Sequence, residues 1–120
     1  MELTESKKLM ASNQMGLFGV ALVAQVLRSS IELIQLDDSC FLHSSWDDQQ
    51  SAVRELSDLL QAIENGDEPN LSRLDRIFAP TGPMQEVSIS SGWGDAFVTV
   101  AAKYDEAAKQ FSDQTSAKEK

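Results

Sequence analysis

The segment Leu17–Leu36, "LFGVALVAQVLRSSIELIQL", decides the fold. Its apolar residues recur three and four positions apart, which is the spacing of one face of an α-helix. The residues with this spacing are Val20, Val23, Ala24, Leu27, Ile31 and Ile34, with Leu22, Val26 and Leu33 beside them. A helix that is apolar over most of its circumference has to be covered on several sides. We therefore expect this helix at the centre of the protein.

A second helix is expected after Ser45, which is a typical N-cap residue. Asp47 and Asp48 would lie in its first turn, where the helix dipole favours negative charge. The pair Asn65-Gly66 is a typical helix end. Its buried stripe is predicted to consist of Ala52, Val53, Leu56, Leu59, Leu60 and Ile63.

Two more helices are expected in the second half of the chain. A short one follows Pro69-Asn70 and ends before Pro80, since proline cannot continue a helix. The last helix is predicted from Trp93 to Phe111, because its large apolar residues are spaced four and three apart. The residues of this seam are Trp93, Phe97, Val100, Tyr104, Ala107 and Phe111.

The fold class predicted from these signals is all-α, a compact single-domain bundle of about four helices over residues 1–120. A Pro/Gly-rich connection within the stretch Ile77–Phe97 precedes the last helix. Within it, "EVSIS" (Glu86–Ser90) is expected as a helical turn or an extended connector. Residues 112–120 are polar and are expected to fray. For residues 1–14 the sequence leaves open whether they fray, continue the central helix or form a separate turn.

Charge and composition restrict the partners. The 120 residues include 19 acidic and 10 basic ones, and the formal net charge is -9. Such a chain repels nucleic acid and anionic membranes, so we expect neither as a partner and favour a basic protein. The uncharged run Leu9–Leu27 imitates a membrane span, but its densest apolar part is too short, so a core helix is preferred. A single cysteine excludes an intramolecular disulfide and favours a cytoplasmic location.

The sequence contains no complete catalytic, cofactor or metal motif, so we expect a protein that is not an enzyme. Cys40 and His43 are three positions apart, which metal ligands can be, but two ligands are a weak signal. The glycines of Ile77–Phe97 match no phosphate-binding pattern. An enzyme or metal protein centred on His43, the only histidine, stays as an alternative.

An acidic segment is the strongest candidate for a binding surface. Asp37–Glu68 contains nine acidic residues and one basic residue, Arg54. On the second helix the polar residues face away from the apolar stripe, so they are predicted to form one acidic outward face. This face is either a solvated surface or a docking surface for a basic partner. The candidate partner-binding residues are Asp47, Asp48, Glu55, Asp58 and Trp46, of which Trp46 is either an anchor or a capping hydrophobe.

The stretch "LDRIFAPTGPMQEVSISSGWGDAF" and the "KYD" that follows it resemble a group of small uncharacterised bacterial proteins. The shared pattern is Phe-x-Pro-Thr-Gly, then Glu, then Gly-Trp, then Phe, and it covers Leu74 to about Asp105. The overall build is similar to that of the small acidic helical immunity proteins that neutralise bacterial toxins. This second resemblance is architectural and carries no residue roles with it.

The sequence therefore predicts a non-enzymatic binding protein, most concretely an immunity protein that docks its acidic face on a basic toxin domain. The alternative is a small structural or regulatory subunit that acts through helix-mediated dimerisation or partner binding. The sequence does not fix the oligomeric state.

Overall fold

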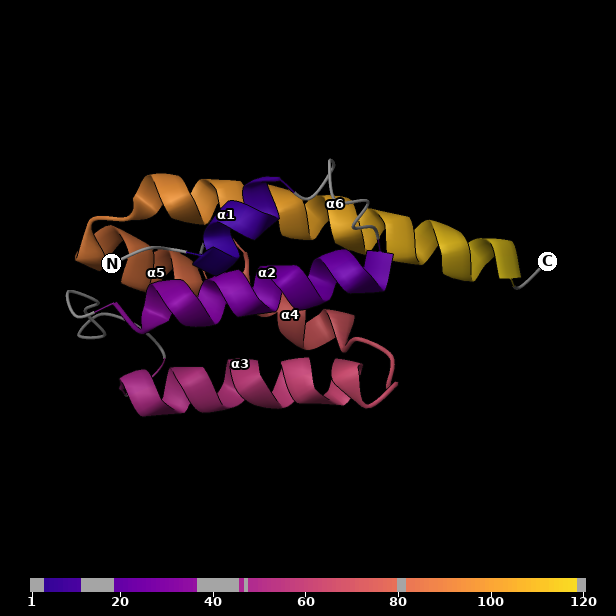
Figure 1. The fold of residues 1–120 in the computed structure, drawn as a ribbon, viewed down its shortest axis with the longest axis horizontal. Helices are drawn as coiled ribbons and strands as arrows, with labels where there is room; N and C mark the ends of the chain where they lie inside the picture. Colours follow the sequence, from indigo (N-terminus) through magenta and orange to yellow (C-terminus); the bar gives the residue numbers. More distant parts are fainter. Residues whose placement is uncertain (1–3, 12–18, 37–45, 47, 80–81, 119–120) are drawn as a thin grey trace.

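The structure, a computed structural model, describes residues 4–11, 19–36, 46, 48–79 and 82–118. The described residues form helices and connections and contain no strand. The helices are α1 Thr4–Met10, α2 Gly19–Ile34, α3 Gln49–Glu64, α4 Leu71–Ile77, α5 Pro83–Ser91 and α6 Gly94–Lys118. Figure 1 shows α6 and α3 on opposite sides of α2, with α4 and α5 behind it.

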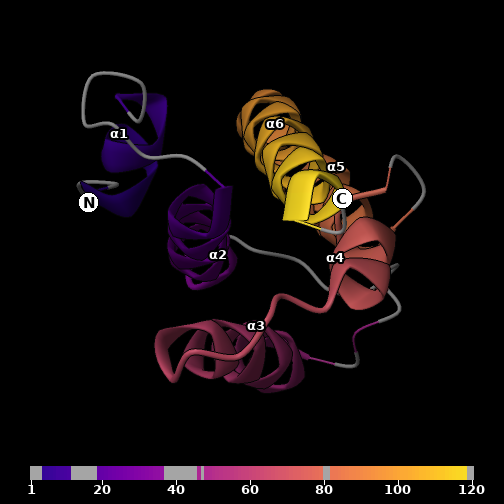
Figure 2. The ribbon, with the colours of Figure 1, turned by 90° about the vertical axis from the view of Figure 1, so that its right-hand side faces the viewer.

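Helix α2 is the centre of the protein, as predicted. It packs against α1, α3 and α6, and Figure 2 shows these three helices arranged around it. The buried apolar residues of α2 are Leu22, Val23, Ala24, Val26, Leu27, Leu33 and Ile34, whereas Val20 and Ile31 are partly exposed. The backbone N–H of Gly19 donates to Oε1 of Gln110 at 2.7 Å, which fixes the start of α2 to α6.

The all-α class is confirmed, but the described chain contains six helices, so the expected number of about four was too low. One additional helix, α1, is separate from α2 and covers it. Leu9 is buried in the core, and Nε2 of Gln25 donates to the backbone oxygen of Glu5 at 2.9 Å. Glu5 also donates its backbone N–H to Oε2 of Glu32 at 2.7 Å. These contacts order a segment that is too short to form a stable helix alone.

The other additional helix, α5, occupies most of the connection that we expected before the last helix. Pro83 stands at its first turn, and Gly92 ends it in the left-handed conformation with φ of 83°. Proline at a helix start and glycine just past its end are the ordinary stop signals. Met84 and Val87 are buried, and the "EVSIS" segment is helical. The start and stop signals of α5 were present in the sequence, but they lie so close together that the segment between them was interpreted as a turn or connector.

Helices α3 and α4 lie close to their predicted positions. The N-cap of α3 is Asp48, whose side chain accepts from the backbone N–H of Ser51 at 2.8 Å, so the expected cap at Ser45 was three residues too early. The predicted end at Asn65-Gly66 is confirmed, with Gly66 at φ 97°. Asn70 caps α4.

Helix α6 begins at Gly94 and continues to Lys118, seven residues beyond the predicted end at Phe111. No proline or glycine follows in residues 95–120, so nothing in the sequence stops the helix. Its buried seam contains Phe97, Val100, Tyr104 and Ala107, as predicted. Figure 1 shows the C-terminal part of α6 extending past the ends of the other helices.

Candidate partner-binding groove

The predicted acidic face lies on α3, and the structure gives its residues different roles. Asp48 caps the helix, and the hydrogen bond from the backbone of Ser51 lowers the pKa of its carboxyl. Asp58 lies further along α3 and is exposed. Trp46 is buried with 7% of its surface accessible, so its indole belongs to the core. Asp47 lies outside the described residues.

Glu55 is partly buried and is contacted by three side chains of the same molecule. Its Oε1 accepts the indole N–H of Trp46 at 2.8 Å, and its Oε2 lies 2.6 Å from Nη2 of Arg73 and 3.6 Å from Nη2 of Arg76. Burial alone would raise the pKa of Glu55. The hydrogen bonds from Arg73 and Trp46 and the two guanidinium charges outweigh burial and hold the pKa below its usual value.

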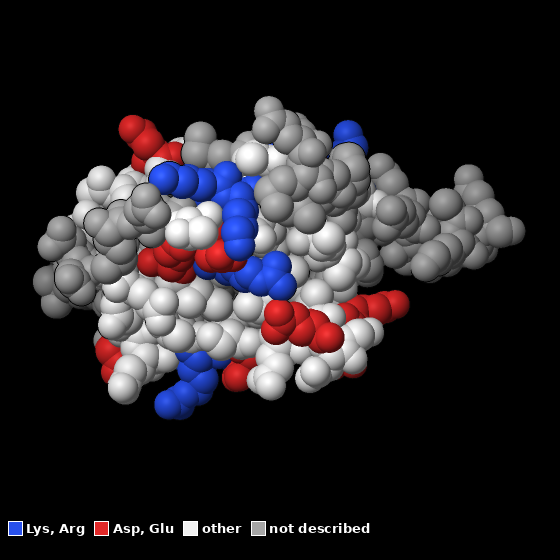
Figure 3. Space-filling model, in the orientation of Figure 1, with Lys and Arg blue, Asp and Glu red and all other residues white. Residues whose placement is uncertain are grey.

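The negative charge of the acidic segment is partly compensated by arginines from other helices. Arg28 of α2 pairs with Glu64 of α3 at 3.1 Å, and the two arginines of α4 pair with Glu55. Six carboxylates lie between Asp48 and Glu68, and with Arg54 these three arginines bring four positive charges to the same region. Figure 3 accordingly shows acidic and basic side chains interspersed on the face that carries α1 and α2. Residues that are distant in sequence supply the compensating charges.

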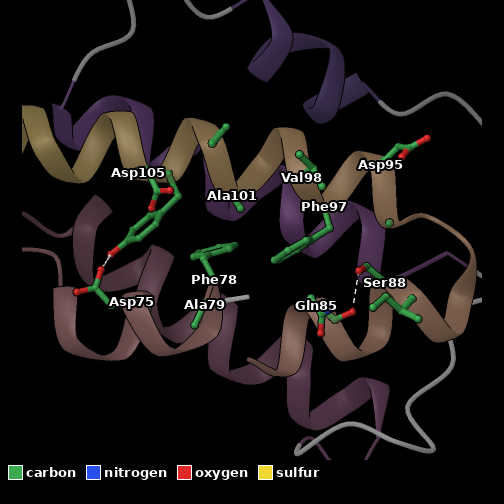
Figure 4. Close-up of a pocket in the computed structure, with 14 residues that line it drawn as sticks. Asp75, Phe78, Ala79, Gln85, Ser88, Asp95, Phe97, Val98, Ala101 and Asp105 are labelled. Atoms are coloured by element: carbon green, nitrogen blue, oxygen red, sulfur yellow. Dashed lines mark hydrogen bonds between the residues drawn. The ribbon is translucent and has the colours of Figure 1, made fainter. Parts of the chain in front are cut away.

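A second candidate site, which we call the α4–α6 groove, lies between α6 on one side and α4 and α5 on the other. Its volume is about 850 Å³. Figure 4 shows α6 along one wall, and α4 and α5 following each other along the opposite wall. The rings of Phe78 and Phe97 point toward one another between the walls. The groove is lined by Asp75, Phe78, Ala79, Gln85, Ser88, Ile89, Gly94, Asp95, Phe97, Val98, Ala101, Ala102, Tyr104 and Asp105.

Aromatic contacts join the two walls of the α4–α6 groove. The rings of Phe78 and Tyr104 stack with centroids 4.9 Å apart. The hydroxyl of Tyr104 donates to Oδ1 of Asp75 at 2.5 Å, which ties α6 to α4. Burial raises the pKa of Tyr104, and the hydrogen bond to Asp75 and the charges of Asp75 and Asp105 raise it further. A neutral phenol therefore stays in place at all ordinary pH values.

Two features distinguish this groove from the rest of the described surface. Ile89 and Val98, each 64% exposed, are the only large apolar side chains among the described residues that are mostly accessible, and both line it. Three lining residues are acidic, and the described lining contains neither Lys nor Arg. Exposed apolar surface bordered by polar groups is typical of interaction sites. The groove thus combines apolar walls with a negative rim.

Sequence reasoning did not identify this groove. Its walls come from α4, α5 and α6, and α5 was not expected to be a helix. One signal was available: Val98 lies next to Phe97 but off the apolar seam of α6, so a large apolar residue was left on the outer side of the helix.

The described residues include no group of three or more His, Cys, Asp or Glu side chains that could hold a metal ion. Cys40 and His43 lie outside the described residues, so the alternative centred on His43 stays a prediction. Of the helices in the described part of the chain, none has the length and apolarity needed to cross a membrane.

Comparisons with protein-family models, with curated proteins and with solved structures found no match. The resemblances given above to small bacterial proteins and to immunity proteins therefore stay predictions, and the case for function depends on the geometry.

Proposed function

We propose that this chain is a non-enzymatic binding protein and that the α4–α6 groove is its docking site for a basic, partly apolar segment of a partner protein. The observation that carries the proposal is the position of Ile89 and Val98. Both side chains are 64% exposed and both line one groove of about 850 Å³. Leaving such groups in water is unfavourable, and covering them releases roughly 25 cal/mol for each Å² of apolar surface.

Charge supports a basic partner. The rim of the groove carries Asp75, Asp95 and Asp105, and the whole chain has a formal charge of -9. Complementary charge accelerates association and excludes acidic proteins, including a second copy of this chain. A toxin domain neutralised by an immunity protein is one such partner, and it is the form of the proposal that the sequence analysis favoured. The predicted α3 face contributes less to this proposal, since Trp46 and Glu55 are engaged within the molecule.

The test compares two double variants that change the net charge equally. Ile89→Lys with Val98→Lys blocks the groove, and Gln50→Lys with Gln61→Lys adds the same two charges to exposed positions of α3. Each variant and the wild type serve as bait for proteins of the native cell, and each captured protein is then purified and titrated. We expect a basic partner that binds the wild type and the α3 variant and loses affinity at least about 30-fold for the groove variant.

Retained affinity in the groove variant, with loss in the α3 variant, would contradict the groove and favour the acidic α3 face. A growth assay tests whether this chain is an immunity protein. Expression of the captured partner alone should arrest growth, and co-expression of this chain should restore it. A partner that leaves growth unaffected would favour the structural or regulatory alternative.

A further inference from the structure

We infer that the occupant of the α4–α6 groove is an amphipathic α-helix of about three turns that carries two Lys or Arg residues ten or eleven positions apart, one at each end of an apolar stripe. The inference rests on the proposed function, because it names the form of the segment that docks in the same groove. Four observations support it, and they concern the length, the walls, the charges and the backbone chemistry of the groove.

The length of the groove is set by α6. Asp95 and Asp105 are ten residues apart on this helix, which corresponds to about 15 Å along its axis. Figure 4 shows Asp95 at one end of the groove and Asp105, with Asp75 across from it, at the other. A helix lying beside α6 has the same rise per residue, so basic side chains ten or eleven positions apart reach the two ends. A small ligand would not span both.

The walls of the groove fit a helix. Close approach of two helices requires small residues at the contact, and the lining contains Gly94, Ala101 and Ala102 on α6 and Ala79 after α4. The exposed side chains of Ile89 on α5 and Val98 on α6 come from opposite walls. Apolar residues of a partner at positions i, i+3, i+4 and i+7 would interdigitate with such an arrangement.

Backbone chemistry and charge argue against two other occupants, an added β-strand and a second copy of this chain. An extended peptide gains affinity by adding to the edge of a sheet, but the described residues contain no strand and offer no edge. A segment from a second copy would bring a chain of net charge -9 to an acidic rim. A helix satisfies its own backbone hydrogen bonds and needs only side-chain complementarity, which the groove provides.

The experiment is a selection from a displayed library of random peptides of about 16 residues, roughly four helical turns. The wild-type chain is the target, and Ile89→Lys with Val98→Lys is the counter-selection. We expect groove-dependent peptides with apolar residues at helical spacing and Lys or Arg ten or eleven positions apart. The consensus peptide, once synthesised, should gain helical circular dichroism on binding.

Single substitutions on the rim then test the spacing. Asp95→Asn and Asp105→Asn should each weaken the consensus peptide about threefold at low salt, since both pairs are exposed, whereas Asp58→Asn on α3 should have no effect. If the groove-dependent peptides are proline-rich or alternate in polarity, the inference of a helical occupant is wrong, but the proposal of a docking site still holds. The absence of any groove-dependent peptide would overturn both the helical occupant and the proposed docking site. A homodimer in sedimentation that the double variant dissociates would make a second copy the occupant and overturn the inference.

Discussion

Replacing Glu55 by alanine should lower the free energy of unfolding by about 2 kcal/mol. Its carboxylate accepts the indole N–H of the buried Trp46 at 2.8 Å, and a hydrogen bond to a charged group contributes about 1.5–3 kcal/mol. Arg73 and Arg76 are 43% and 68% exposed, so their pairs with Glu55 add only about 0.5 kcal/mol. In a domain of this size the loss corresponds to a decrease in Tm of roughly 6–10 °C.

The assay is urea unfolding followed by far-ultraviolet circular dichroism, with Asp58→Ala as the matched control. Asp58 is an exposed acid on the same helix, and its removal should change the free energy of unfolding by less than about 0.5 kcal/mol. A double-mutant cycle with Trp46→Phe should give a coupling energy of about 1 kcal/mol. If Glu55→Ala were as stable as Asp58→Ala, Glu55 would be an ordinary surface acid, and our argument that it is engaged within the molecule would be refuted.

Three further predictions concern Glu55, Tyr104 and Gly82. Because the pKa of Glu55 is lowered by folding, its contribution is present above the unfolded value of about 4.3 and is lost as the pH falls, so the stability difference between the wild type and Glu55→Gln should shrink below that pH. Because folding raises the pKa of Tyr104, the wild type should lose stability relative to Tyr104→Phe above about pH 10. Tyr104 is the only tyrosine, so the absorbance of tyrosinate should rise only when the protein unfolds. A rise in the folded protein would contradict the hydrogen bond to Asp75. Gly82→Ala should destabilise the protein by roughly 1–3 kcal/mol in urea unfolding, because the added Cβ would meet backbone carbonyls of α4, whereas the Cβ of Gly94→Ala meets nothing and the change should be neutral.

The main helices could be predicted from the sequence because their signals are local. The apolar spacing of α2 and the stop at Asn65-Gly66 depend only on residues within the helix or next to it, and the structure has both. The errors are local as well. Asp48 competes with Ser45 as a cap, and α5 is a nine-residue helix whose start and stop signals stand close together.

The site could not be predicted, because its properties come from residues distant in sequence. The charge of Glu55 is compensated by arginines of α4, and that of Glu64 by Arg28 of α2. No periodicity within α3 reveals these pairs. The groove likewise requires three helices to lie in a particular arrangement, and one of them was not expected. The sequence did reveal that the chain is acidic, and this property still determines the partner that we propose.

The most direct test of the groove is a methyl chemical-shift titration of the wild-type chain with the consensus peptide from the selection. Our account predicts that the largest changes occur at the methyl groups of Ile89, Val98 and Ala101, which line the α4–α6 groove. The methyl groups of Ala52 and Val53 on α3 should not change. Shifts concentrated on α3, with Ile89 and Val98 unaffected, would contradict the central claim.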